Sequence, residues 1–341
     1  MEKLRTRNIL FVVLIGIVVF TVFIAEIGLG RSMHLMSNIN KTLIPIMILL
    51  NILNSIAFTI SWKFLIPGQI SFYKLFTFYI AGTFINNITP AFGAGGEPVK
   101  AILLGNETGI SKAECFAGVV SQRLLSIFPF LVIELIGIGL LFRNPALVIG
   151  RWEMPALVFS VIFGICAFGL LAYFYTRKDK LSSFVRLIIR FSAPLIRPFN
   201  KDFYHREYAD AAEQSINSFH SGLRYIYSNK NGLFNAVFFS FIAWISDIMV
   251  MYVVFLSLGS ETHISVLIIA YLISMVSGWI TLLLPGGIGV VDSTMATLFI
   301  LGGVPLEVAL LATLLYRLSS YWFNTVLGAF YLWNSLKKSI S

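Results

Sequence analysis

The sequence predicts an all-α polytopic membrane protein with about six full transmembrane helices and two opposed re-entrant hairpins in an inverted repeat. Of the 341 residues, 57% are hydrophobic and only 12% are charged, roughly half the charged share of a soluble domain. The apolar residues form runs of about 20, the length at which a helix crosses the hydrocarbon core. Because so apolar a chain cannot cover itself with polar side chains, its surface must face lipid.

Uninterrupted apolar runs predict the full spans, at 9–29, 43–66, 115–142, 155–175, 233–258 and 308–333. Two further apolar stretches, 72–104 and 266–301, are broken by Pro and Gly residues. Non-helical backbone at membrane depth is tolerated only inside protein or against a wet cavity. We therefore expect each broken stretch to fold as a re-entrant hairpin whose tip lies inside the bundle.

The distribution of basic residues predicts the orientation. The polar segment 176–231 holds ten Lys and Arg residues, and basic loops favour the cytoplasmic side. We expect a multi-pass protein of the cell (plasma) membrane with this segment and both termini in the cytoplasm. Counting spans from there, one hairpin enters from the cytoplasm and the other from outside. Helical apolar spacing in 181–196 and 203–223 predicts amphipathic helices on the anionic leaflet, with a solvated linker as the alternative.

The two broken stretches share an ordered series of residues. Glu97 follows Pro90 by seven residues, and Asp292 follows Pro285 by seven. Both intervals are rich in Gly, and each series continues to an Arg that lies 14 residues after a Gly. Since the predicted topology runs the two series in opposite directions, they indicate an inverted repeat, in which transporters place the substrate site at the repeat interface.

The repeat organises a single membrane domain, 1–341. It begins with a first span and outer loop, 8–42. Repeat 1 is 43–142 and contains the re-entrant stretch 72–104. The fifth run and the basic cytoplasmic segment follow at 143–232. Repeat 2 is 233–335 and contains the re-entrant stretch 266–301.

Four charged residues of the two series are expected to be buried or nearly so: Glu97, Arg123, Asp292 and Arg317. A charge at the bilayer centre costs about 2.5–3.5 kcal/mol, so these side chains are expected to pair or to face a wet cavity. A guanidinium matches a phosphate with two parallel donors. We expect the two arginines to line one cavity and hold an anionic headgroup, with the carboxylates as their partners. The alternative is two ion pairs that only fix helix packing.

Other polar residues indicate no reaction chemistry. The two Cys and four His residues are scattered and give no disulfide framework or metal spacing. The sequence has no set of nucleophile, base and acid and no Asp-x-Asp motif at a membrane edge, so we predict no catalytic residue, metal or cofactor. The net charge of +9 indicates anionic headgroups, not nucleic acid. Asp247 is an acid well inside a predicted span. We expect it either to line the cavity or to form a hydrogen bond to a neighbouring helix.

These motifs resemble the lysylphosphatidylglycerol synthase transmembrane-region family, which includes the flippase half of the bacterial multiple peptide resistance factor. Its most specific element here is the run that begins at Pro285 and reads Pro-Gly-Gly-Ile-Gly-Val; Asn86-Asn87, Gly96-Glu97, Gln122-Arg123-Leu124 and Arg317-Leu318 also match. The chain departs at three positions: Lys100 replaces the usual Arg, Asp292 the common Glu, and Gln122 a Glu. The resemblance implies a flippase-like module without the aminoacyl-transferring domain. The candidate substrate-binding residues are Asn87, Pro90, Glu97, Lys100, Arg123, Pro285, Gly286, Gly287, Gly289, Asp292 and Arg317.

The function expected from this resemblance is transport or scrambling of anionic lipids or of polyprenyl-phosphate-linked sugars. The alternatives are a membrane-embedded enzyme, an accessory subunit of a lipid-modifying or glycosyl-transfer enzyme, and a structural partner of another membrane enzyme. The candidate partners are accordingly lipids with anionic headgroups, polyprenyl phosphates, a lipid-modifying enzyme or glycosyltransferase, and a second copy of the chain in a homodimer.

Overall fold

The computed structural model describes residues 2–66, 68–89, 95–143, 153–177, 179–180, 183, 205–280 and 284–338. All elements in these ranges are helical, which confirms the all-α class. In chain order they are α1 (Glu2–Ile27), α2 (Leu29–Ser37), η1 (Lys41–Leu43), α3 (Ile44–Lys63), α4 (Phe72–Ile88), α5 (Glu97–Thr108), α6 (Lys112–Leu125), α7 (Ile127–Phe142), α8 (Glu153–Thr176), α10 (His205–Ser228), α11 (Lys230–Ser257), α12 (Ile264–Ile280), η2 (Pro285–Gly287), α13 (Val290–Leu301), α14 (Leu306–Arg317), η3 (Leu318–Trp322, a π-helix) and α15 (Phe323–Lys338).

Within the described ranges, three helical segments are long and apolar enough to cross a membrane: Lys41–Lys63, Lys112–Phe142 and Lys230–Ser257. A fourth candidate is the pair Val12–Ile27 and Leu29–Ser37, whose two helices are bent by 95°. The bend falls at Gly28, where φ is 85°, a left-handed conformation that ends a helix and that Gly adopts without strain. The described part of the chain thus contains three such segments, or four with the bent pair, while the number of six full spans stays a prediction.

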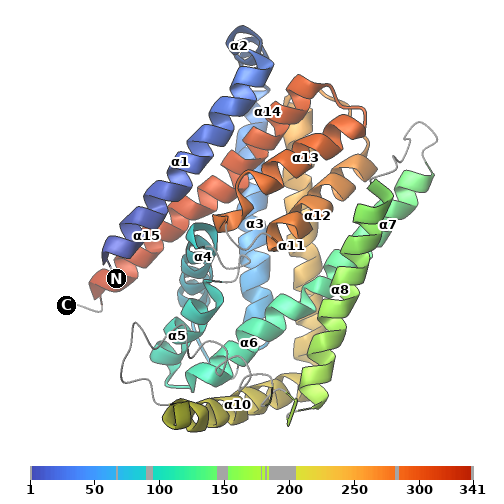
Figure 1. Cartoon of the computed structure of the whole chain (residues 1–341). Coiled ribbons are helices and arrows are strands. Elements are labelled where there is room, and N and C mark those ends of the chain that lie inside the picture. The colour runs from blue at the N-terminus through green and yellow to red at the C-terminus, as the bar shows by residue number, and fades with distance from the viewer. Residues whose placement is uncertain are drawn as a thin grey trace.

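Helices α3 and α11 pack side by side through the middle of the bundle (Figure 1). Asn54 Nδ2 donates to the carbonyl oxygen of Ala243 at 2.9 Å, and Ser61 Oγ donates to that of Ala236 at 2.8 Å. Residue numbers rise along α3 as they fall along α11, so the two helices are antiparallel. Small residues and interhelical hydrogen bonds at this contact are typical of helix packing in lipid.

Each broken stretch contains two helices separated by its Pro/Gly break. The first consists of α4 and α5, and the second of α12, η2 and α13. In Figure 1, α4 and α5 lie in the lower half of the view, and α12 and α13 lie in the upper half. Helix α4 packs against α15, and α12 packs against α7. Each stretch therefore contacts a long helix from the other half of the chain.

Helix α10 covers the second part of the basic segment and crosses the lower end of the bundle (Figure 1). Its apolar side chains face α6: Ile216 and Leu223 are buried, and the Phe219 ring lies 6.2 Å from that of Phe116. This apolar face thus packs on the protein, and contact of the helix with the lipid leaflet stays a prediction. The first expected surface helix, 181–196, lies outside the described residues apart from Ser183.

Candidate functional site

A cluster of charges lies where α5 begins. Glu97 is the first residue of α5, and its Oε1 accepts a hydrogen bond from Asn86 Nδ2 at 3.1 Å. The backbone N–H of Gly96 in turn donates to Asn86 Oδ1 at 2.5 Å, which fixes α5 to the end of α4. Lys100 Nζ lies 3.1 Å from Glu97 Oε2, and Arg123 Nη1 lies 3.7 Å from Glu97 Oε1. We call Glu97, Lys100 and Arg123 the first cluster.

The helical spacing explains this arrangement. Lys100 follows Glu97 by three residues on α5, so both side chains lie on one face. The Lys100 ammonium lies 4.5 Å from the centre of the Tyr79 ring, a cation–π contact. Gly82 on α4 leaves room for the Lys100 stem, which a Cβ at that position would meet. Glu97 and Lys100 are buried, whereas the Arg123 side chain is 38% exposed.

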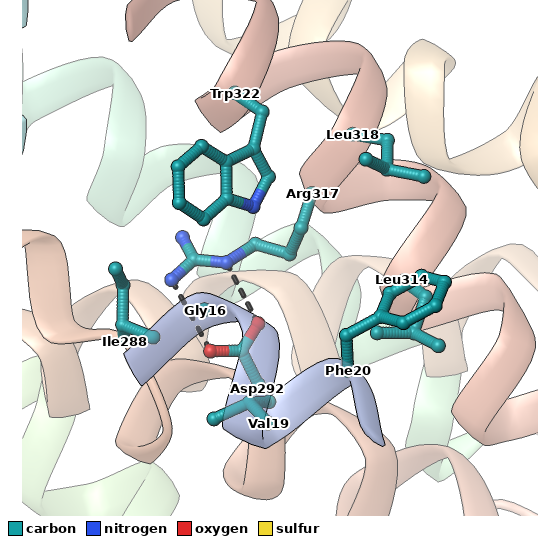
Figure 2. A pocket seen from close by; sticks show the side chains of 9 residues that line it. All are labelled: Gly16, Val19, Phe20, Ile288, Asp292, Leu314, Arg317, Leu318 and Trp322. Carbon is teal, nitrogen blue, oxygen red and sulfur yellow. Dashed lines mark hydrogen bonds and ion pairs between the residues drawn. The ribbon is translucent and has the colours of Figure 1, made fainter. Parts of the chain in front are cut away.

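The second cluster is the ion pair between Asp292 on α13 and Arg317 at the end of α14 (Figure 2). Arg317 Nε donates to Asp292 Oδ1 at 2.7 Å, and Arg317 Nη2 donates to Asp292 Oδ2 at 3.3 Å. Arg317 Nη2 also lies 3.4 Å from the carbonyl oxygen of Gly286. Asp292 Oδ2 accepts the backbone N–H of Gly289 at 2.7 Å, which caps the start of α13. Both charged side chains are buried.

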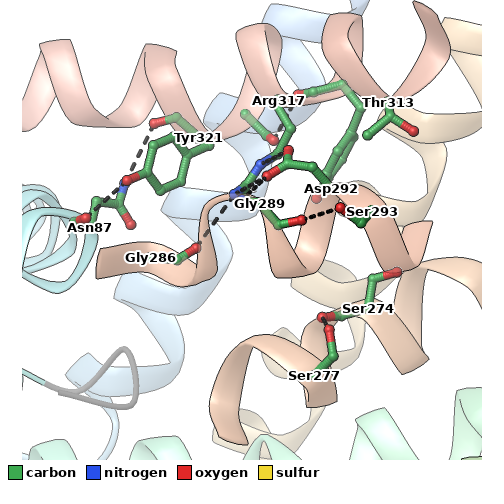
Figure 3. A network of polar contacts seen from close by, with 12 residues as sticks. Asn87, Ser274, Ser277, Gly286, Gly289, Asp292, Ser293, Thr313, Arg317 and Tyr321 are labelled. Carbon is green, nitrogen blue, oxygen red and sulfur yellow. Dashed lines mark hydrogen bonds and ion pairs between the residues drawn. The ribbon is translucent and has the colours of Figure 1, made fainter. Parts of the chain in front are cut away.

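The Pro-Gly-Gly-Ile-Gly element supplies the backbone that this pair requires (Figure 3). Gly286, Gly287 and Gly289 all have positive φ, at 57°, 64° and 87°. Residues with a Cβ rarely adopt these angles. At Gly286 a Cβ would also collide with the ring of Tyr321. The glycines therefore allow a tight turn whose carbonyl and N–H groups contact the Asp292–Arg317 pair directly.

Helix α1 closes the second cluster. A pocket of about 310 Å³, counting its open mouth, lies beside the ion pair and is lined by Gly16, Val19, Phe20, Ile288, Asp292, Leu314, Arg317, Leu318 and Trp322 (Figure 2). The part of it that a water-sized molecule could occupy is only about 20 Å³, which is room for about one water and far less than a small-molecule site offers. Gly16 packs so tightly on the Trp322 ring that a Cβ would collide with it. The second pair is therefore electrically balanced and covered by a helix outside both predicted repeats.

A bonded path connects the two clusters. The Arg317 guanidinium lies 4.4 Å from the centre of the Tyr321 ring, and Tyr321 donates its hydroxyl to the backbone oxygen of Asn87 at 2.9 Å. Asn87 Nδ2 donates to Thr325 Oγ1 at 2.8 Å. Its chain neighbour Asn86 holds Glu97. The pocket of the second cluster is lined by no residue of the first, so one cavity shared by the two arginines stays a prediction.

The structure places most of the residues expected from the sequence in or beside these clusters. Pro285 is buried in η2, Asn87 joins the connecting path, and Pro90 lies outside the described residues. The sequence interpretation did not find Tyr79, Tyr321, Trp322 or Gly16. Tyr321 follows Arg317 by four residues, so helical spacing could have identified it. The contribution of α1 left no comparable pattern, because Gly16 acts through its lack of a side chain.

Comparisons with known proteins agree with this description. The chain matches the family described as the lysylphosphatidylglycerol synthase TM region over residues 9–328. It is 30% identical to the UPF0104 membrane protein MJ1595 of Methanocaldococcus jannaschii over 333 residues, covering 96% of this chain and 95% of that protein. It is 28% identical to a UPF0104 membrane protein of Methanothermobacter thermautotrophicus over 325 residues, covering 93% and 92%. No solved structure matches the chain significantly. The chain is a membrane protein and belongs to the lysylphosphatidylglycerol synthase transmembrane-region family.

Proposed function

We propose that this protein is a flippase-like transporter or scramblase of anionic lipids or polyprenyl-phosphate-linked sugars. The first cluster carries the proposal. Two cations, Lys100 and Arg123, surround the single carboxylate of Glu97, so the three side chains together have a formal charge of +1. An anionic headgroup would balance that charge. Arg123 is accessible to such a group because its side chain is 38% exposed, and its planar fork suits phosphate.

The proposed architecture is an inverted repeat of 43–142 and 233–335 in the plasma membrane, with six full spans and both termini cytoplasmic. In it, α4–α5 and α12–α13 are the opposed re-entrant hairpins. Three observations support it: α3 and α11 are antiparallel, each hairpin packs on a long helix of the other repeat, and an acid stands in the first turn of both α5 and α13. Helix N-termini inside the bundle carry positive dipole ends, which favour anionic substrates at the repeat interface.

The proposal gives the two arginines different tasks, and the geometry of their clusters supports this. In the first cluster the positive charge exceeds the negative charge, and Arg123 is partly exposed. The second cluster is balanced, buried and covered by α1. We therefore propose that Lys100 and Arg123 bind the headgroup. The Asp292–Arg317 pair instead attaches the second hairpin to α14.

The test is a headgroup-resolved flipping assay with the purified chain in liposomes. Fluorescent phosphatidylglycerol, phosphatidylcholine and a polyprenyl phosphate are followed separately. Lys100→Met keeps a side chain of similar length beside Tyr79 and leaves Glu97 paired with Arg123. We expect it to fold and to lose most movement of the anionic lipids, because the excess positive charge is gone. Lys74→Met is the matched control, since Lys74 pairs with Glu107 in an exposed position on α4.

Equal movement of anionic lipids by wild type and a stably folded Lys100→Met variant would refute the headgroup role of the first cluster. Lack of movement of any lipid by the wild-type chain would refute transport by this chain alone. In that case the accessory-subunit alternative would take its place.

A further inference from the structure

A further polar centre lies in the middle of the bundle and is formed by residues that belong to neither cluster. Asp247 stands near the midpoint of the long apolar helix α11. Its Oδ2 accepts the hydroxyl of Tyr271 at 2.6 Å, and its Oδ1 accepts the hydroxyl of Tyr316 at 3.1 Å. The two tyrosine rings come from α12 and α14, and their centres lie 6.0 Å apart. Both carboxylate oxygens thus have a donor, and both donors are neutral.

Charged groups on the surrounding elements leave Asp247 without a counter-ion. Helix α11 packs against α3, α6, α7, α10, α12, α14, η1 and η3. The titratable groups that face Asp247 are Tyr271 and Tyr316, which bond to it, and Tyr79 of α4, which lies within reach of its charge. Among the side chains that the structure describes, none of the other charged or basic groups on these elements bonds to Asp247: Lys41, Lys63, Lys112, Glu114, Arg123, Glu134, His220, Arg224, Glu307 and Arg317. Among the described residues, Asp247 therefore has two hydrogen-bond donors and no basic side chain as an ion-pair partner.

The position of Asp247 links it to the second cluster. Tyr316 immediately precedes Arg317 on α14, and Tyr271 lies on α12, whose chain continues to Gly286 and Asp292. One carboxylate thus contacts α14, which carries Arg317, and α12, which precedes the turn that contacts Arg317. The π-helix η3 begins directly after Arg317, and single π-turns inside α-helices occur frequently at functional sites.

We propose that Asp247 is a proton-binding site that controls how α12 and α14 are held against α11. The proton comes from water and attaches to one carboxylate oxygen, while both phenols keep their own protons. The side chain then changes from an anion with two donors to a neutral acid that is itself a donor. Hydrogen bonds to a charged group are roughly twice as strong as neutral ones, so protonation weakens both tyrosine contacts. The further step, that this couples a proton to lipid movement, rests on the proposed function.

The proton site is tested without any transport, by infrared difference spectroscopy of the purified full chain during a pH titration. Wild type should show a carboxyl band that appears as pH falls, and Asp247→Asn should lack it. Tyr316→Phe removes one donor to the ionised form and should move the midpoint of the band to higher pH. Two control variants should leave the band and its midpoint unchanged. Tyr252→Phe changes another tyrosine, on the same helix as Asp247, and Glu134→Gln changes another acid, which is buried on α7.

Three results would overturn the proton site: a band that persists in Asp247→Asn, a band that disappears in Glu134→Gln instead, or a signal that responds to sodium but not to pH. Coupling is tested separately, by lipid movement in liposomes at several pH values. Asp247→Asn should move lipid at a rate independent of pH, close to the wild-type rate at low pH. An unchanged pH dependence in this variant would refute the coupling. If the chain titrates at Asp247 as expected while no sample, wild type included, moves lipid, that result would refute the proposed function but not the proton site.

Discussion

Replacing Arg317 by Lys separates a structural arginine from a ligand-binding one. The wild-type guanidinium makes two hydrogen bonds to Asp292, at 2.7 and 3.3 Å, and a long third one to Gly286. A lysine ammonium keeps the charge but not the planar fork, and we expect it to keep one of the three. Each hydrogen bond to a charged group contributes about 1.5–3 kcal/mol. Both partners are buried, so solvent does not screen the loss, and the two lost bonds should lower the free energy of unfolding by about 3–6 kcal/mol.

The assay is thermal or denaturant unfolding of the purified chain in micelles, with Arg31→Lys as the matched control. Arg31 Nη1 pairs with Glu307 Oε1 at 2.8 Å, but its side chain is 69% exposed. Exposed ion pairs contribute at most about 1 kcal/mol, and a lysine can restore a single contact. Arg31→Lys should therefore unfold within about 1 kcal/mol of wild type.

Equal stability of Arg317→Lys and Arg31→Lys would refute the reasoning, because the buried fork would then contribute nothing measurable. If Arg317→Lys were stable and also lost lipid movement, the assignment of tasks would be wrong. Arg317 would then bind the headgroup, as the sequence interpretation expected of both arginines.

Three further predictions follow from the same geometry. Glu97→Gln leaves Lys100 and Arg123 without their carboxylate and should cost about 3–5 kcal/mol of unfolding free energy; thermal unfolding should show a smaller loss in phosphatidylglycerol nanodiscs than in phosphatidylcholine, and equal losses would contradict an anion site. Gly96→Ala should cost about 1–3 kcal/mol, because its Cβ would overlap the Gly82 carbonyl oxygen; Gly139→Ala, which meets nothing within 4 Å, is the thermal-shift control, and an equal shift in both would count against the tight α4–α5 contact. The topology is tested with single cysteines after replacement of the exposed Cys166. An external, membrane-impermeant reagent should label cysteines at Ser37 and Glu261 but not at Asn200 and Ser339. External labelling at Asn200 would overturn the topology.

The membrane class and the ion-pair partners were predictable because their physical signals are local. Apolar run length identifies helices that cross lipid. Charges placed in those runs must find partners, and the repeated series predicted that Glu97 and Asp292 are the carboxylate partners of the two arginines. The structure places Glu97 next to Arg123 and Asp292 next to Arg317. Their role in substrate binding stays a prediction.

Features that depend on tertiary packing were not predictable in the same way. The apolar face of α10 has the same spacing whether it meets lipid or α6, so only the structure could show that Ile216 and Leu223 are buried. In the sequence, the two arginines also occupy equivalent positions in the two repeats, so the same role was predicted for both. Their difference comes from Lys100, which adds a cation to the first cluster only, and from α1, which covers the second through Gly16 and Trp322.

That difference bears on how an inverted repeat could move a lipid in this chain. Two identical half-sites would bind a headgroup equally on either side of the pseudo-symmetry axis. Here the first cluster combines two cations with one carboxylate, whereas the second pairs one arginine with one carboxylate. Asn87 and Tyr321 join the two through backbone and side-chain hydrogen bonds, so a shift of Arg317 would move the end of α4 that also carries the partner of Glu97. A headgroup bound at the first cluster and the closed pair at the second would then respond to each other through a few bonds.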